Sequence, residues 1–181
     1  MKWLIASDIH GSAFYCQKLL EAYTRESADK MLLLGDILYH GPRNDLPKGY
    51  SPKDVIALLN PLADRILCVR GNCDTEVDQM VLSFPIMADY AVLDIGTKII
   101  YATHGHKHTP DAPPPLQHDD ILLTGHTHIP ACQPFGNLNL YINCGSVSIP
   151  RENSPHAYMI LENGKFTWKS LEGSVFMEHQ V

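Results

Sequence analysis

The sequence predicts an α/β protein in which two packed sheets carry helices on their outer faces. In the first half, short apolar runs alternate with amphipathic helical patterns, an order typical of parallel strands joined by right-handed crossovers. In the second half, strand patterns follow one another across short turns, which favours a mostly antiparallel arrangement. The 181 residues are 45% hydrophobic and 19% charged, as expected for one domain spanning residues 1–181.

The first half contains three strand patterns and two helix patterns. Ser12 is a suitable N-cap for the first helix, whose apolar residues recur at helical spacing. Ser51-Pro52 supplies a cap and a proline at the first position of the second helix. Residues 37–50 are rich in Gly, Pro and Asn and are expected to form a loop. The three buried strands are expected at 2–7, 31–35 and 66–70.

The second half is dominated by strand patterns and turn signals. Gly96-Thr97 and Asn163-Gly164 each separate two apolar runs and predict hairpins. Residues 109–118 contain four prolines and indicate a loop. Strands are expected at 89–95, 98–103, 120–124, 138–142, 156–162 and 165–172.

Charge and cysteine content narrow the class of function. The formal net charge is −6, and no basic stripe is present, which argues against nucleic acid as a substrate. The five cysteines form no C-x-x-C pair and are expected to be reduced thiols. The sequence has neither a secretion signal nor a membrane-span pattern, so we expect a cytoplasmic protein with no membrane partner. A homo-oligomer stays open, with Leu46, Pro47 and Tyr50 of the 37–50 loop as candidate contacts.

Seven polar residues follow five of the predicted strands, at the edge of a sheet where open α/β proteins bind ligands. Each motif alone is weak, and Asn72 by itself would be assigned to a turn. Their repetition at successive strand ends predicts a metal site. The residues are Asp8, His10, Asp36, Asn72, His104, His126 and His128.

The ligand types point to a pair of divalent ions. Carboxylate, amide and imidazole donors without thiolate favour Mn²⁺, with Fe, Zn²⁺ or Ni²⁺ as alternatives, over Ca²⁺. Asp36 is the expected bridge, with one oxygen for each ion. Two divalent ions outweigh Asp8, Asp36 and a bridging hydroxide by one positive charge, which suits in-line attack on an anionic phosphate.

Taken in order, these motifs resemble the calcineurin-like metallophosphoesterase superfamily. They read Asp8-Ile9-His10, Gly35-Asp36, Gly71-Asn72-Cys73-Asp74, His104 and Gly125-His126-Thr127-His128. The segments 40–44 and 143–150 look closer still to the small bacterial YfcE-type phosphodiesterases. The resemblance implies a four-layer α/β/β/α sandwich, with two mixed sheets face to face and helices outside, and a dinuclear metal centre. It assigns Asp8, His10, Asp36 and His128 to one ion, and Asp36, Asn72, His104 and His126 to the other.

Cys73 departs from the superfamily pattern. Many members have His at this position, where it donates a proton to the leaving oxygen. A neutral thiol is a poorer donor, and general acid catalysis contributes typically ~10²–10⁴-fold. With Asn72, Cys73 and His104 as the candidate catalytic residues, we therefore expect a preference for phosphodiesters and good leaving groups. The alternative is that Cys73 is a tolerated small residue and another group supplies the proton.

Four further residues are candidate substrate contacts. Arg43 and Arg151 could bind phosphate bidentately, although a solvated role or a subunit contact is as well supported. Asn44 and His106 complete the set.

The function that these observations favour is a phosphodiesterase acting on small phosphate diesters by in-line attack of a metal-bridging hydroxide. The enzymatic alternative is a phosphomonoesterase or phosphoprotein phosphatase, against which Cys73 argues. The alternative of another class is a non-catalytic, protein-binding scaffold with the same fold. A scaffold need not keep every ligand, whereas this chain has all seven.

Overall fold

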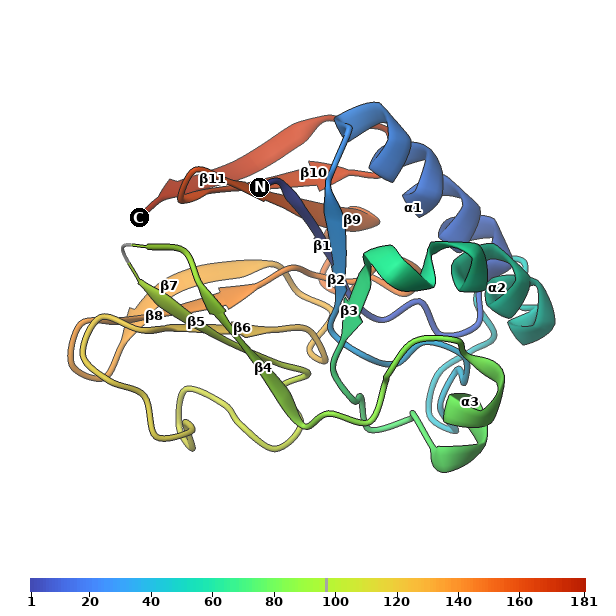
Figure 1. The fold of residues 1–181 in the computed structure, drawn as a ribbon, viewed down its shortest axis with the longest axis horizontal. Helices are drawn as coiled ribbons and strands as arrows, with labels where there is room; N and C mark the ends of the chain where they lie inside the picture. The colour runs from blue at the N-terminus through green and yellow to red at the C-terminus, as the bar shows by residue number, and fades with distance from the viewer. Residues whose placement is uncertain (97) are drawn as a thin grey trace.

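The computed structural model describes residues 1–96 and 98–181, and these form two β-sheets packed face to face (Figure 1). The first sheet has the strand order β11-β10-β9-β1-β2-β3, and the second has the order β4-β5-β6-β8-β7. The first sheet comprises β1 (Trp3–Ala6), β2 (Lys30–Leu33), β3 (Ile66–Cys68), β9 (Ala157–Glu162), β10 (Lys165–Ser170) and β11 (Val175–Gln180). The second comprises β4 (Tyr90–Asp94), β5 (Ile99–Thr103), β6 (Ile121–Thr124), β7 (Ala131–Phe135) and β8 (Asn139–Asn143).

The helices are α1 (Ala13–Glu26), α2 (Pro52–Leu59) and α3 (Glu76–Val81), and a short 3₁₀ helix, η1 (Asn60–Arg65), continues α2. Ser12 caps α1 as predicted, because its side chain accepts the backbone N–H of Tyr15 at 3.1 Å. Pro52 stands at the start of α2, where a missing N–H costs nothing. None of the described helices is long and apolar enough to span a membrane.

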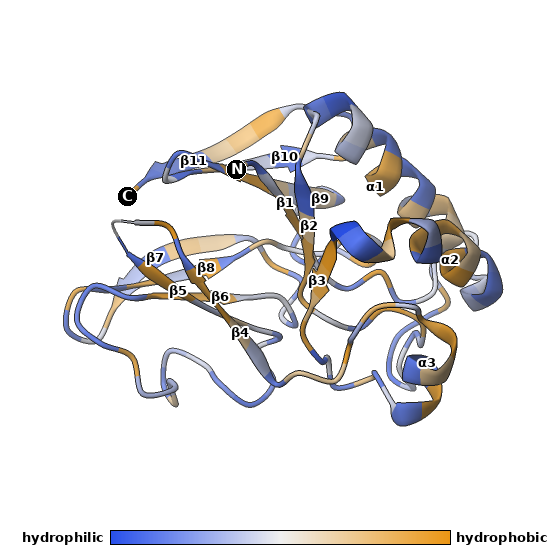
Figure 2. Cartoon of the chain, in the orientation of Figure 1, coloured by the Kyte–Doolittle hydropathy of each residue, from blue (hydrophilic) through white to orange (hydrophobic). Residues whose placement is uncertain are grey.

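The alternation of side chains along the strands creates two separate cores. Leu4 and Met31 point to the outer face of the first sheet, where they pack in one cluster with residues of α1 and α2 such as Leu19. Ile5 and Leu32 point to the inner face. There they meet the second sheet and the buried Trp168 in a second cluster. Figure 2 shows the same concentration of hydrophobic residues in the strands of both sheets.

The strand directions confirm the predicted parallel first half and, with two exceptions, the predicted antiparallel second half. β1, β2 and β3 are parallel, and β9 joins them as an antiparallel neighbour of β1. In the second sheet, however, β5, β6 and β8 are parallel, and only the edge strands β4 and β7 are antiparallel. Four of the six pairings formed within the second half, β4–β5, β7–β8, β9–β10 and β10–β11, are antiparallel as expected, and the parallel pairings β5–β6 and β6–β8 are the exceptions. The reason is that β7, an unpredicted edge strand, carries the chain back between β6 and β8.

Three elements were not predicted from the sequence. β7 contains Pro134, which is tolerated because the strand lies at a sheet edge. β11 is mostly exposed, so it lacks the apolar run of a buried strand. α3 has a readable signal, since Thr75 and Asp78 form a capping box.

The helical layer covers one sheet only. α1 and α2 lie against the first sheet, whereas the long connection between β5 and β6 runs along the second (Figure 1). The two mixed sheets are thus as predicted, but in the described residues the fourth layer is a loop instead of a helix, because residues 109–118 are too rich in proline to form one. β4 and β5 pair as the expected hairpin, but Thr97 of its predicted turn lies outside the described residues.

Candidate metal centre

The loops that follow β1, β2, β3, β5 and β6 bring all seven sequence-predicted ligands together. Parallel pairing of β1 with β2, in which Ala6 faces Leu33, places the loop of Asp8 beside the loop of Asp36. The Asp8 N–H donates to the Gly35 carbonyl at 3.1 Å, so the two loops are also bonded directly.

Three nitrogen and oxygen donors converge around Asp8. His10 Nε2 lies 3.4 Å from Asp8 Oδ1, and His128 Nε2 lies 3.2 Å from the same oxygen. His10 Nε2 is also 3.6 Å from Asp36 Oδ2. Asp8, His10, His128 and Asp36 are all buried. These four side chains therefore present their donor atoms to one small volume.

A second group of donors forms around His104. Its Nε2 lies 3.5 Å from Asp36 Oδ2 and 3.1 Å from Asn72 Oδ1. His126 Nδ1 lies 3.2 Å from His104 Nε2. The two groups share one atom, Asp36 Oδ2. Asp36 Oδ1 is occupied otherwise, since it accepts the N–H of Cys73 at 2.8 Å.

The imidazoles are oriented by hydrogen bonds to main-chain carbonyls. The Nδ1 atoms of His10, His104 and His128 lie 2.8, 2.6 and 2.7 Å from carbonyl oxygens. An Nδ1–H that donates to a carbonyl leaves Nε2 unprotonated and turned toward the cluster, the arrangement typical of metal-binding histidines.

Two buried atoms of the cluster have no hydrogen-bond partner in the described part of the chain. They are Asp8 Oδ1 and His10 Nε2. Buried polar atoms are nearly always satisfied, so a pair of orphans facing each other indicates a missing partner. Asp8, His10 and His128 have donor atoms close enough to hold one cation, and so do Asp8, Asp36 and His104. The residues therefore fit the divalent metal that their chemistry suggests.

Electrostatic coupling within the cluster is strong. Burial raises the pKa of Asp8, but the neighbouring imidazoles of His10, His128 and His104 outweigh it and hold that pKa well below its usual value. For His104 the signs are reversed. Burial lowers the pKa of this imidazole, but the carboxylates of Asp36 and Asp8 outweigh burial and raise the pKa to about 9. A proton on His104 thus balances the carboxylates when no cation does, and a bound metal would compete with that proton.

Five of the seven residues adopt a left-handed backbone. The φ values are 61° for Asp8, 48° for His10, 55° for Asp36, 64° for His126 and 63° for His128. This region is uncommon for residues other than glycine, and such strain clusters at functional sites. The strand-end loops therefore depend on surrounding contacts to hold them.

Residues that sequence reasoning did not single out supply those contacts. The buried Asp74 carboxylate accepts the N–H groups of Asp36, Ile37 and Gly71 at 2.8, 2.9 and 2.7 Å. It thereby joins the loop after β2 to the loop after β3. Asp74 is the last residue of the Gly71–Asp74 motif. The motif is visible in the sequence, but the role of Asp74 in joining the two loops is not.

The last residue of β8 and the segment after it hold the loops that follow β6 and β1. Asn143 Nδ2 donates to the carbonyl of Gly125 at 2.6 Å and to Thr127 Oγ1 at 3.1 Å. Ser146 and Ser148 donate from their hydroxyls to the Asp8 carbonyl at 3.1 and 2.9 Å. The two serine bonds join residues that are more than a hundred positions apart in the sequence, so only the folded chain reveals them.

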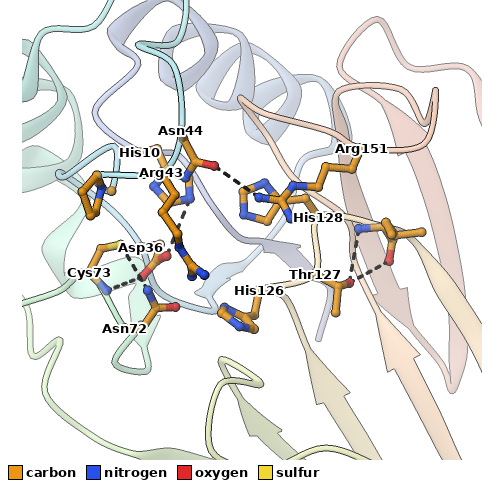
Figure 3. Close-up of a pocket in the computed structure, with 13 residues that line it drawn as sticks. His10, Asp36, Arg43, Asn44, Asn72, Cys73, His126, Thr127, His128 and Arg151 are labelled. Atoms are coloured by element: carbon orange, nitrogen blue, oxygen red, sulfur yellow. Dashed lines mark hydrogen bonds and ion pairs between the residues drawn. The ribbon is translucent and has the colours of Figure 1, made fainter.

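A cavity of about 500 Å³ opens over the cluster (Figure 3). The candidate substrate contacts Arg43, Asn44 and Arg151 line it, as does Cys73. His106 does not line this pocket, although its ring centre is 5.4 Å from that of His104. Burial and the neighbouring His104 lower the pKa of His106 to about 4.

Cys73 is half-buried beside the ligands. Its Sγ accepts a hydrogen bond from Asn72 Nδ2 at 3.2 Å. Burial and the negative charge of Asp36 raise the pKa of the Cys73 thiol to about 12. The side chain that replaces the superfamily histidine is therefore a neutral thiol and a weak acid.

Comparison with known proteins agrees with this geometry. Residues 1–165 match the calcineurin-like phosphoesterase superfamily domain. Phosphodiesterase YfcE of Escherichia coli K12 is 44% identical over 163 residues, which cover 90% of this chain and 88% of that protein. The probable metallophosphoesterase YsnB of Bacillus subtilis is 26% identical over 170 residues, 89% of this chain and 83% of that protein.

Solved structures show the same relationship. The structure of E. coli YfcE, described as a phosphoesterase, superimposes with a TM-score of 0.94 at 41% identity and covers 99% of this chain and 98% of that one. Vps29 of Entamoeba histolytica, solved with Zn²⁺, has a TM-score of 0.60 at 21% identity, with 99% and 98% covered, and shows the fold alone. The chain therefore belongs to the calcineurin-like phosphoesterase superfamily, and it is a hydrolase with a YfcE-like fold.

Proposed function

We propose that this protein is a metal-dependent phosphodiesterase that hydrolyses small phosphate diesters at a dinuclear centre. The observation that carries the proposal is the division of seven ligands into two groups around Asp36 Oδ2. When bound, two divalent ions, Mn²⁺ first among the candidates, supply an activated water for in-line attack and neutralise charge on the phosphoryl group. The name of the E. coli relative, a phosphodiesterase, supports the substrate class.

The chain's own residues divide the work. Asp8, His10, Asp36 and His128 would hold one ion, and Asp36, Asn72, His104 and His126 the other. Asp36 would be the residue that both ions share, because its Oδ2 faces His10 and His104, while its Oδ1 accepts the Cys73 N–H; one oxygen for each ion stays a prediction.

Diesters fit the site better than monoesters for two reasons. The neutral Cys73 thiol is a poor proton donor, so substrates with good leaving groups are favoured. The cavity is also larger than a phosphoryl group requires, which leaves room for ester substituents beside Arg43 and Arg151.

The setting that we propose is the cytoplasm. All five cysteines are unpaired, which suits a reducing compartment. For a homo-oligomer, the contact surface that we propose is the 37–50 loop. There Leu46 is 62% exposed, as a subunit contact requires, whereas Pro47 is buried.

The decisive experiment is a turnover assay of chelator-treated protein that has been reloaded with Mn²⁺, Zn²⁺, Ni²⁺ or Fe²⁺. We expect hydrolysis of bis(4-nitrophenyl) phosphate to exceed that of 4-nitrophenyl phosphate and to require metal. His104→Ala should abolish turnover, whereas Arg65→Gln, an exposed residue paired with Asp64, should not affect it. No turnover with any metal would favour a non-catalytic scaffold instead.

A further inference from the structure

Arg151 stands at the rim of the pocket on a loop that neighbouring residues hold firmly. Its N–H donates to the carbonyl of His128 at 3.2 Å, and its own carbonyl accepts the hydroxyl of Ser154 at 2.6 Å. Its guanidinium donates through Nη2 to Asn44 Oδ1 at 3.2 Å. Asn44 is in turn fixed by a bond from Nδ2 to the His40 carbonyl at 2.8 Å. Arg151 is thus held by hydrogen bonds both at its main chain and at its guanidinium.

Most of the binding capacity of this guanidinium is unused. Arginine offers five N–H donors, and within residues 1–96 and 98–181 the side chain of Arg151 makes only the bond to Asn44. No carboxylate in those two ranges lies within ion-pair distance of Arg151. A guanidinium that lines a pocket without an acidic partner matches a carboxylate or phosphate on a ligand.

The reacting phosphoryl group has other partners. Arg43 extends into the pocket toward the ligand cluster, whereas Arg151 reaches toward Asn44 (Figure 3). On the proposed function, the metal centre already balances the single negative charge of a phosphodiester. The charge of Arg151 is then left without a counterpart in the bound state.

We propose that Arg151, aimed by Asn44, forms a subsite for a second anionic group carried by one ester substituent of the substrate. This inference rests on the proposed function and adds the substrate class to it. The second group is a carboxylate or a phosphate. Arg43 serves the reacting phosphoryl group instead, so the two arginines have different effects on specificity.

A matched pair of synthetic diesters separates the two roles. They are 4-carboxyphenyl 4-nitrophenyl phosphate and its neutral isostere, 4-carbamoylphenyl 4-nitrophenyl phosphate. With Mn²⁺-loaded enzyme, we expect kcat/KM to favour the carboxylate at least about tenfold, because a charge-assisted hydrogen bond to Arg151 forms only there. Arg151→Gln should bring the ratio near one. Arg43→Gln should slow both substrates and keep the ratio.

A binding measurement tests the subsite without turnover. Calorimetry should show that 4-carboxyphenylphosphonate binds at least about tenfold more tightly than 4-carbamoylphenylphosphonate, and that Arg151→Gln removes the difference. Arg65→Gln is the control and should retain it. Equal use of both diesters by the unaltered enzyme, or an equal loss for both in Arg151→Gln, would overturn the inference. Failure to hydrolyse either diester with any metal would instead overturn the proposed function, and calorimetry would still decide the subsite.

Discussion

Gly71→Ala should displace the Asp36 carboxylate and weaken metal binding. A Cβ built on Gly71 would overlap Asp36 Oδ1 and the Asp36 backbone nitrogen, and it would lie 2.8 Å from Asp36 Cγ. Ordinary contact begins at 3.4 Å, so the contact with Asp36 Cγ alone requires a movement of about 0.6 Å and the two closer contacts require more, whereas metal–ligand distances tolerate only about 0.2 Å. Gly71 has no left-handed φ, so the penalty is purely steric.

The expected magnitudes follow from that overlap. Overpacking of this kind costs about 1–3 kcal/mol of folding stability. Because the shifted Asp36 belongs to both ligand groups, we expect the dissociation constant for Mn²⁺ to rise about 10–100-fold or more. Calorimetric titration of chelator-treated protein measures the affinity, and urea denaturation of the same sample measures the stability.

The matched control is Gly136→Ala. Gly136 has a φ of 53°, and no atom lies within 4 Å of the position that an added methyl group would take, so alanine there adds backbone strain without a clash. It should cost about 1–2 kcal/mol of stability and leave metal affinity unchanged. Wild-type Mn²⁺ affinity in Gly71→Ala would refute the argument that close packing of these loops sets the position of Asp36.

Four further changes test other parts of the structure. Cys73→His should raise the rate on a simple alkyl phosphomonoester such as glycerol 2-phosphate relative to bis(4-nitrophenyl) phosphate, because an imidazolium is the better proton donor to a poor leaving group; an unchanged ratio of initial rates refutes this. Asp74→Asn removes at least one of three hydrogen bonds to main-chain N–H groups and should cost about 1–3 kcal/mol in urea denaturation. Trp168→Phe should cost a similar amount, about 1–3 kcal/mol, because it leaves a buried carbonyl of β8 without its 2.7 Å donor; a change below the error of denaturation would contradict it. Burial raises the pKa of Glu26, but the hydrogen bonds from Lys169 and Tyr158 lower it by a larger amount, so the net shift is downward. The stability that Lys169 adds should therefore be present at neutral pH and vanish as pH falls through the folded-state pKa of Glu26, and Lys169→Met should converge on the wild type in acid.

The parts of the fold that are local in sequence were predictable. The strands β1, β2 and β3 follow from short apolar runs, the N-cap at Ser12 from capping chemistry, and the start of α2 from Pro52, although Ser51 makes no side-chain capping bond. β11 and β7 were not predicted because an apolar run indicates a buried strand, and exposed edge strands need no such run. The parallel order of β5, β6 and β8 was not predicted for another reason. Pairing partners are chosen by sheet packing and not by the strand's own residues.

The sequence by itself predicted which residues are candidate metal ligands, because each of them follows an apolar strand and a strand end sets where its loop emerges. Only the tertiary structure shows which atoms of these candidate ligands face one another. His10 and His104 both face Asp36 Oδ2, although 94 positions separate them and nothing between them in the sequence encodes the contact. The same holds for Asp74, Asn143 and Arg151, whose partners come from other loops. Burial and orientation of a polar group depend on all the chain segments that pack around it, and those segments meet only when the sheets assemble.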